Sequence, residues 1–117
     1  MNKIIKDAFW SEVDSGRSLY INSSFDKAFQ KFERAHILGQ SNVLLHTYSH
    51  ICMLKIGFAK KDFKEILGQL LRIPSGFLGS MIGFYPEGNT GGSNISAFKK
   101  LKIPEDLEKI LNSKEEC

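Results

Sequence analysis

The sequence has few cysteines, no long apolar run and no large excess of either charge. Cys52 and Cys117 are the two cysteines among 117 residues, so no disulfide framework is indicated and a reducing compartment is expected. The longest apolar run, residues 43–58, is interrupted by two histidines and a lysine and is too short to span a bilayer. The net charge of +3 is spread along the chain, whereas nucleic-acid binding leaves a denser basic stripe. We therefore expect a cytoplasmic protein that binds neither membranes nor nucleic acids.

Signatures of secretion and of two common chemistries are also missing. Asp7 follows Lys3 and Lys6 near the N-terminus, and no apolar segment with a small-residue cleavage site comes after them, so no signal peptide is expected. No Gly-x-Ser-x-Gly elbow is present, which argues against acyl transfer by a serine nucleophile. The glycines of residues 88–92 are not followed by the Gly-Lys-Ser/Thr of a phosphate-binding loop. These absences leave open whether the protein is an enzyme.

Helical periodicity extends over most of the chain. The composition, 42% apolar and 25% charged, is that of a soluble globular domain, and apolar residues recur every three or four positions. The expected main helices cover residues 2–15, 24–39, 42–56 and 60–73, and shorter ones cover 75–84 and 104–112. Pro74 is expected to end the fourth helix, and a glycine-rich loop is expected at 86–94. The pattern predicts one all-α domain over residues 1–117, a bundle of four main helices with short C-terminal helices and a disordered tail at 113–117.

All three histidines of the chain lie close to an expected turn at residues 40–42. A short connection makes the two flanking helices antiparallel neighbours, so residues whose numbers sum to about 82 face each other. His36 is then opposite His46, and Glu33 is opposite His50. Residues three or four apart share one face of a helix, so Glu-x-x-His on one helix and His-x-x-x-His on the other converge.

Three imidazoles and a carboxylate on facing helices are a suitable donor set for a transition metal. Imidazole binds Zn, Fe and Ni well, and helical bundles build metal sites from facing helices. A di-iron site would need a second Glu-x-x-His, which the chain lacks. The sequence therefore predicts one divalent ion held by His36, His46 and His50. Glu33 is expected to be the fourth ligand or a base for metal-activated water.

Two further side chains are expected near the histidines. Folding about the next turn places Gln69 opposite His50, where its amide is a hydrogen-bond partner for the ring. Arg72 lies one turn further along the same helix and is a candidate to hold an anion.

The glycine-rich loop is a weaker candidate site, formed by Gly88, Asn89 and Thr90. Its backbone N–H groups would offer an anion-binding nest if the loop folds over the histidines. A tight surface turn explains the same glycines without any ligand, and this structural interpretation is favoured.

The histidines have a plainer interpretation as well. They would form a satisfied polar cluster with Glu33 and Gln69 that fixes the register of the helical hairpin. The protein would then be a non-catalytic interaction or assembly module that binds a protein partner or forms a homo-oligomer. Its candidate contact surface would contain the aromatic residues Trp10, Phe77 and Phe84. A metal site would depend on chelators and a structural cluster would not.

Five segments stand out together in chain order: Glu33–Gln40, His46 with His50, Met53–Leu54, Gly68–Arg72 and Gly88–Gly92. They resemble an uncharacterised family of small bacterial proteins, domain of unknown function 3703, over roughly residues 25–107. The resemblance implies a compact helical bacterial protein and transfers no activity. The arrangement of the histidines is also loosely similar to metal-binding four-helix bundles of the DinB type, which hold a divalent ion with three histidines.

Overall fold

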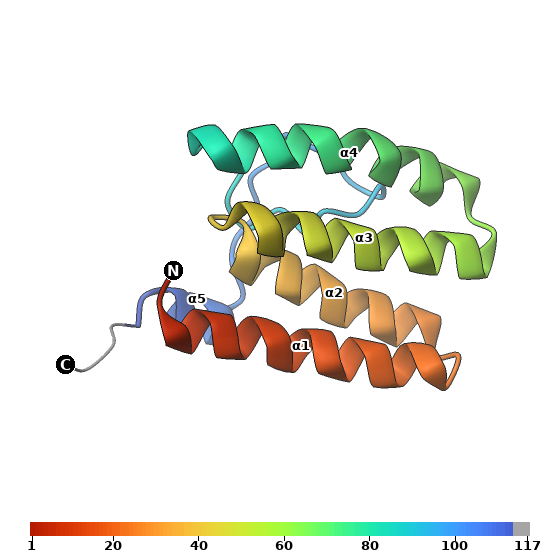
Figure 1. The fold of residues 1–117 in the computed structure, drawn as a ribbon, viewed down its shortest axis with the longest axis horizontal. Helices are drawn as coiled ribbons and strands as arrows, with labels where there is room; N and C mark the ends of the chain where they lie inside the picture. Colours follow the sequence, from red (N-terminus) through yellow and green to blue (C-terminus); the bar gives the residue numbers. More distant parts are fainter. Residues whose placement is uncertain (114–117) are drawn as a thin grey trace.

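The computed structural model describes residues 1–113, and it contains helices but no strand within them. In chain order the helices are α1 (Lys3–Ile21), α2 (Phe25–Gly39), α3 (Val43–Lys60), α4 (Phe63–Ile82) and α5 (Glu105–Leu111) (Figure 1). The prediction of an all-α fold is confirmed for these residues. The tail expected to be disordered lies, from residue 114 onward, outside the described residues. Across residues 1–113, no helix combines the length and the apolar character needed to cross a membrane.

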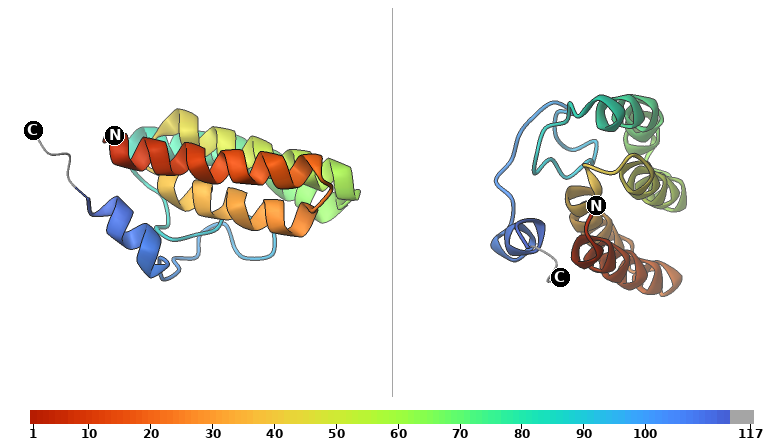
Figure 2. Two further views of the ribbon diagram at one scale, coloured as in Figure 1. Left: turned by 90° about the horizontal axis from the view of Figure 1, so that it is seen from below. Right: turned by 60° about the vertical axis from the view of Figure 1, so that its left-hand side comes forward.

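The first four helices lie side by side in chain order and form an open row. α1 packs on α2, α2 packs on α3, and α3 packs on α4, whereas α4 packs against α3 alone among the described helices (Figure 1). The segment of residues 83–104 leaves the end of α4 and crosses the side of the row, so that α5 rests against α1 and α2 (Figure 2). α4 is therefore the helix with the fewest helical neighbours of the four.

Side-chain caps explain where three of the helices begin. The side chains of Asn2, Asn42 and Asp62 each accept hydrogen bonds from backbone N–H groups of the following turn, at 3.0–3.1 Å. The break between α2 and α3 lies at the predicted place, and Asn42 is the N-cap of α3. This short break makes α2 and α3 antiparallel neighbours.

Three helices are longer than the sequence pattern predicts, and α3 continues to Lys60, past its predicted end at residue 56. α1 continues past Gly16 to Ile21. Gly16 packs against the ring of Phe32 at a place where a side chain would collide, so it serves close packing and does not end the helix. α4 continues through Pro74, so the prediction of a separate helix at 75–84 was wrong. Proline removes one backbone donor, which leaves the carbonyl of Leu70 without its usual partner. Both residues are exposed, so water can solvate this carbonyl and the helix tolerates the proline.

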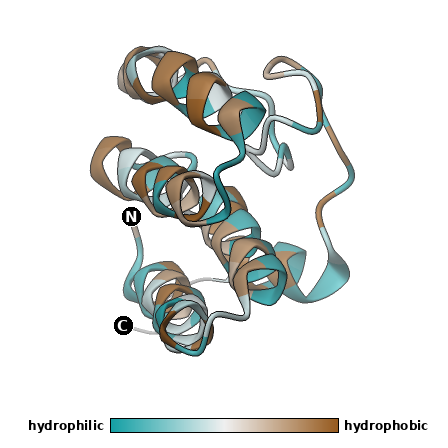
Figure 3. Ribbon diagram, turned by 90° about the vertical axis from the view of Figure 1, so that its right-hand side faces the viewer, coloured by the Kyte–Doolittle hydropathy of each residue, from teal (hydrophilic) through white to brown (hydrophobic). Residues whose placement is uncertain are grey.

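The hydrophobic core lies between α1, α2 and α3 and is closed at one end by α5. Its buried residues are Phe9, Val13, Ala28, Phe32, Ala35, Ile37, Leu38, Leu45, Cys52, Met53, Ile56 and Leu107. α4 contributes none of them, and the residues that it buries are Glu65, Gln69 and Ser80. Large apolar residues of α4 are exposed instead, and Figure 3 shows hydrophobic residues (brown) over much of this helix. We call the buried residues Glu65, Gln69 and Ser80 of α4, together with His36, His46 and His50, the polar layer.

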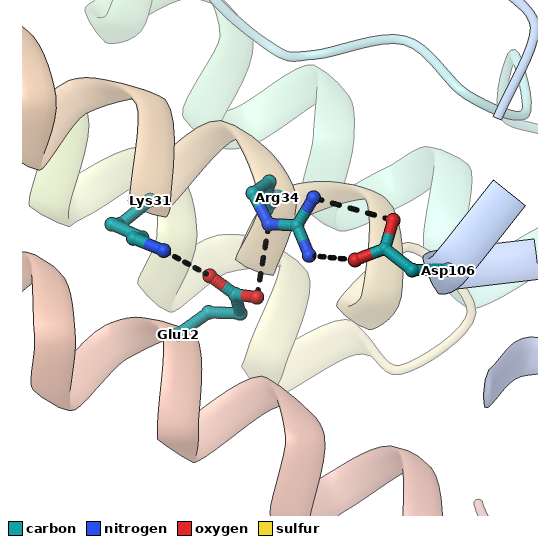
Figure 4. A network of polar contacts seen from close by, with 4 residues as sticks. All are labelled: Glu12, Lys31, Arg34 and Asp106. Carbon is teal, nitrogen blue, oxygen red and sulfur yellow. Dashed lines mark hydrogen bonds and ion pairs between the residues drawn. The ribbon is translucent and has the colours of Figure 1, made fainter. Parts of the chain in front are cut away.

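An ion-pair network fastens α5 to the first two helices (Figure 4). Glu12 on α1 accepts a hydrogen bond from Arg34 Nε at 2.9 Å, and it pairs with Lys31 Nζ at 3.8 Å. The guanidinium of Arg34 also pairs with Asp106 on α5, and this hydrogen bond lowers the pKa of the Asp106 carboxyl. Arg34 therefore links α1, α2 and α5 on the side of the row away from α4.

Candidate metal centre

The three histidines come together in the polar layer with their Nε2 atoms facing one another. The Nε2–Nε2 distances are 3.0 Å between His36 and His46, 3.1 Å between His36 and His50, and 3.2 Å between His46 and His50. All three side chains are buried, with exposed fractions of 2–4%. His36 lies in the last turn of α2, and the other two lie in the first half of α3. These are the histidines that the antiparallel hairpin was expected to join.

Each ring is held from behind by a different partner. His36 Nδ1 donates to the backbone carbonyl of Asn89 at 2.7 Å. His50 Nδ1 donates to Gln69 Oε1 at 2.6 Å, and His46 Nδ1 lies 2.5 Å from Ser80 Oγ. The three partners come from the loop after α4 and from α4 itself, so these two segments orient every ring of the cluster.

The roles of these partners determine where the ring protons lie. The carbonyl oxygen of Asn89 can only accept. The Ser80 hydroxyl donates its own proton to the Gln40 carbonyl at 2.7 Å, so it accepts from His46. The Gln69 amide nitrogen donates to Glu65 Oε2 at 2.7 Å and to the Gly91 carbonyl at 2.8 Å, which turns its oxygen toward His50. Each neutral ring therefore carries its proton on Nδ1.

Three Nε2 lone pairs consequently point into one small space. Two nitrogens that both present lone pairs cannot hydrogen-bond, so the close approach is repulsive unless a cation lies between them. In a tetrahedral zinc site with Zn–N bonds of about 2.0–2.1 Å, the ligand nitrogens lie about 3.3 Å apart. The observed triangle of 3.0–3.2 Å is close to one face of such a tetrahedron. The donor set and its spacing therefore fit a single transition-metal ion.

The electrostatics keep the rings neutral, as a metal ligand must be. Burial, and then the neighbouring ring of His50, lower the pKa of His46 to about 3. Burial also lowers the pKa of His50 to about 4, with a smaller contribution from Arg72. The pKa of His36 lies well below its usual value because of burial and then the two other rings. At neutral pH all three rings are therefore unprotonated and available to a metal.

Glu65 supports the cluster from one layer further out. Its buried carboxylate accepts hydrogen bonds from Gln69 Nε2 at 2.7 Å, from the Ser93 hydroxyl at 2.9 Å and from the Ser93 backbone N–H at 3.1 Å. A continuous chain thus runs from Glu65 through Gln69 to His50, which is the usual way to fix the ring of a metal-binding histidine. Glu65 was not among the predicted site residues, although its position one turn before Gln69 on the same helix was a usable signal.

Glu33 is not brought to the histidines. The group of side chains whose ligand atoms lie within 4.8 Å of one another consists, among the described residues, of the three histidines alone. Glu33 instead lines a depression together with Asp26, Lys60 and Glu65, and it lies next to the loop residue Thr90. Burial and, to a smaller extent, the nearby carboxylate of Glu65 raise its pKa. The carboxylate of Glu33 therefore lies outside the group of ligand atoms, and its expected role as a base stays a prediction.

The glycine-rich loop folds over the cluster and supports it through its backbone. The Asn89 side chain accepts from Gly91 N–H at 2.9 Å and donates to the Ser96 and Lys99 carbonyls, which locks the loop in place. Gly91 has a φ of 87° and lies against the ring of His36, where a side chain would collide. Gly88 N–H donates to Gln40 Oε1 at 3.1 Å, and Thr90 lies beside the Glu33 carboxylate. The loop thus holds a histidine through its backbone, and a separate anion nest in the loop stays a prediction.

A cavity of about 290 Å³ opens over the three Nε2 atoms. Its floor consists of the histidines, and its walls contain Arg72 and apolar residues of α4 and of the following segment. Gly76 lies at the junction, where an added Cβ would be 3.2 Å from His46 Cε1 and 3.3 Å from His50 Nε2. The absence of a side chain at Gly76 leaves the lone pairs accessible from the cavity.

Fold and site together define an all-helical protein with a buried three-histidine cluster that is open to a cavity on one side. The chain matches the family described as protein of unknown function (DUF3703) over residues 3–111, and it belongs to that family. The resemblance of the ordered sequence segments is thereby confirmed. No curated protein and no solved structure matches the chain.

Proposed function

We propose that this protein binds one divalent transition-metal ion through the Nε2 atoms of His36, His46 and His50. The observation that carries the proposal is the convergence of three buried lone pairs, each enforced by an Nδ1 hydrogen bond on the far side of the ring. Imidazole ligands of this number suit Zn, Fe or Ni. Glu33 is left out of the ligand set because its carboxylate lies elsewhere.

The proposed centre keeps one coordination position free toward the cavity. Three protein ligands plus an open position are typical of metal sites that act on a bound molecule, whereas structural zinc sites are closed by a fourth protein ligand. Because the three ligands are neutral, the full positive charge of the ion would act on whatever enters the cavity. Burial and the ordered hydrogen bonds behind each ring support a resident ion and argue against a carrier that hands its metal on.

Elemental analysis of the untagged protein tests the proposal directly. About one equivalent of a transition metal is expected after purification or after reconstitution, and it should be lost in the His46→Ala/His50→Ala variant. The exposed Lys55→Ala on the same helix is the matched control and should retain the metal. Circular dichroism of each variant separates loss of the site from loss of the fold. Absence of metal after reconstitution with Zn²⁺, Fe²⁺, Ni²⁺ and Cu²⁺ would overturn the proposal.

A second candidate function, assembly with a second copy of the chain, is favoured by the outer face of α4. Its apolar residues alternate at intervals of four and three, the spacing of a helix seam that packs on another helix. The stripe contains Phe63, Leu67, Leu70, Pro74, Phe77 and Met81. No charged residue interrupts this stripe, so a second copy of the chain would present an equally uncharged one. Among the described helices α4 packs on α3 alone, which leaves the stripe without a helical partner. Light scattering should give a dimer that Leu67→Glu converts to a monomer, and a monomeric wild type would exclude this candidate.

A further inference from the structure

The cavity over the histidines contains one cationic side chain without an acidic partner. Arg72 Nη2 donates to the Ile95 carbonyl at 2.9 Å, and Arg72 Nε is buried without a hydrogen-bond partner among the described residues. None of the ion pairs formed by residues 1–113 includes Arg72. A guanidinium held this way retains unused donors for an anion, and its fork suits a carboxylate.

Two glycines on α4 give Arg72 and the cavity their space. An added Cβ at Gly68 would lie 2.7 Å from Arg72 Nη1 and 2.7 Å from Ser93 Cβ, so glycine lets the guanidinium fold back along the helix. Gly76 opens the floor of the cavity, as described above. Glycine inside a helix is less favourable than alanine, so both positions weaken α4 while they shape the site.

The remaining walls of the cavity are mainly apolar. They include Leu78, Ile82, Phe84, Ala97 and Phe98. The hydroxyl groups of the lining belong to Ser75, which donates to backbone carbonyls of α4, and to Tyr85. A phosphate or sulfate ion needs several donors around its oxygens, whereas a carboxylate needs few. The volume of about 290 Å³ exceeds the roughly 150 Å³ of an apolar cavity that holds benzene. The space therefore suits an anion that carries a compact apolar body.

We infer that the cavity binds a small monocarboxylate, with its oxygens between the metal and Arg72 and its aliphatic or aromatic body against the apolar wall. This inference rests on the proposed metal centre. A carboxylate in this position would balance part of the charge of the ion and of Arg72, which the neutral histidines do not. Arg72 would then determine the choice of ligand, and the histidines would hold the metal in the presence or absence of that ligand.

Cobalt-loaded protein provides the test, because bound Co²⁺ reports its ligands in its visible spectrum. Metal content is measured first, and benzoate, benzamide, acetate and inorganic phosphate are then titrated separately. Benzoate should bind about tenfold or more tightly than benzamide, which lacks the charge, and also more tightly than acetate and phosphate, which lack the apolar body. Arg72→Met should weaken benzoate binding about tenfold or more with the cobalt content unchanged. The control Lys64→Met removes an exposed cation from the same helix and should leave benzoate affinity within about twofold.

The outcomes separate the two proposals. One equivalent of cobalt with no spectral response to benzoate, or with equal affinity in wild type and Arg72→Met, overturns the carboxylate inference and leaves the metal centre intact. Equal affinity for phosphate and benzoate likewise overturns it, because the apolar wall would then play no part. Failure to bind cobalt or any of the other metals overturns the proposed function, and the inference falls with it.

Discussion

The two interfaces of α3 differ in kind. On one side, α3 meets α1 and α2 through a dry core of aliphatic and aromatic residues. On the other side, α3 meets α4 through the polar layer, and the groups that α4 buries are a carboxylate, an amide and a hydroxyl. The first interface is stabilised by removal of apolar surface from water, which needs no particular partner. The second depends on directional hydrogen bonds and, in our proposal, on an ion, so α4 is the helix whose docking we expect to be conditional.

The largest effect should come from a cavity in the dry core. Leu38→Ala removes a fully buried side chain of α2 and should lower the free energy of unfolding by about 3–5 kcal/mol. The matched change Leu71→Ala, on the exposed side of α4, should alter it by about 0.5 kcal/mol or less. Chemical denaturation of both variants gives the comparison. Similar losses for the two leucines would contradict the assignment of the core to the first three helices.

Acid should act on the polar layer of the metal-free protein. Unfolded histidines take up protons below about pH 6.5, whereas His46 and His50 in the folded protein do so only near pH 3 and 4. The unfolded state therefore binds more protons below pH 6.5, and stability falls as the pH falls through that range. A decrease of about 1.4 kcal/mol per histidine is expected between pH 7.5 and 5.5, or about 4 kcal/mol if all three contribute. Denaturation at both pH values measures it, and a His46→Gln variant should show a smaller decrease.

Metal should stabilise the polar layer more than the core. A free metal concentration a hundredfold above Kd should raise the free energy of unfolding by about 2.7 kcal/mol. Hydrogen exchange locates the effect, and the amides of α4 should become protected on addition of Zn²⁺ more strongly than those of α1. Chelation should reverse the change. Uniform protection, or no response to chelator, would contradict the conditional docking of α4.

The smallest of these effects should follow from breaking the outer hydrogen-bond chain. Gln69→Leu removes the acceptor for His50 Nδ1 and the donors to Glu65, so Zn²⁺ affinity should fall about 10–100-fold. Competition with a chromophoric chelator measures the affinity. The exposed Gln30→Leu on α2 is the matched control and should leave it unchanged. Wild-type affinity in Gln69→Leu would show that this chain does not orient the ring.

Local features of the sequence were sufficient for the hairpin that carries the histidines. A short break at residues 40–42 makes two helices antiparallel, and helical periodicity then brings His36 opposite His46. The same spacing rule predicted Glu33 beside the histidines, but its carboxylate lies outside the group of ligand atoms that the three rings form. The prediction that Pro74 ends the fourth helix was wrong, because solvent exposure made a proline tolerable inside α4.

The partners of the histidines depended on contacts that no local pattern encodes. Ser80 and Asn89 lie 34 and 53 residues from the rings that they contact. Both reach the histidines only because α4 is longer than predicted and because the following loop folds back over the cluster. Counting residues along the helices was enough to predict Arg72 near the site. The burial of its unpaired Nε atom depends on the packing of the segment around Ile95 against α4, which no local pattern predicts.

The sequence by itself therefore determined the helical class, the family and the meeting of three histidines, because periodicity, caps and a short turn are local properties. Tertiary structure alone decided the tautomer of each ring, the distance of Glu33 from the cluster and the opening of a cavity at Gly76. These depend on which groups from distant segments are packed together, and hydrogen-bond direction and excluded volume are properties of that packing.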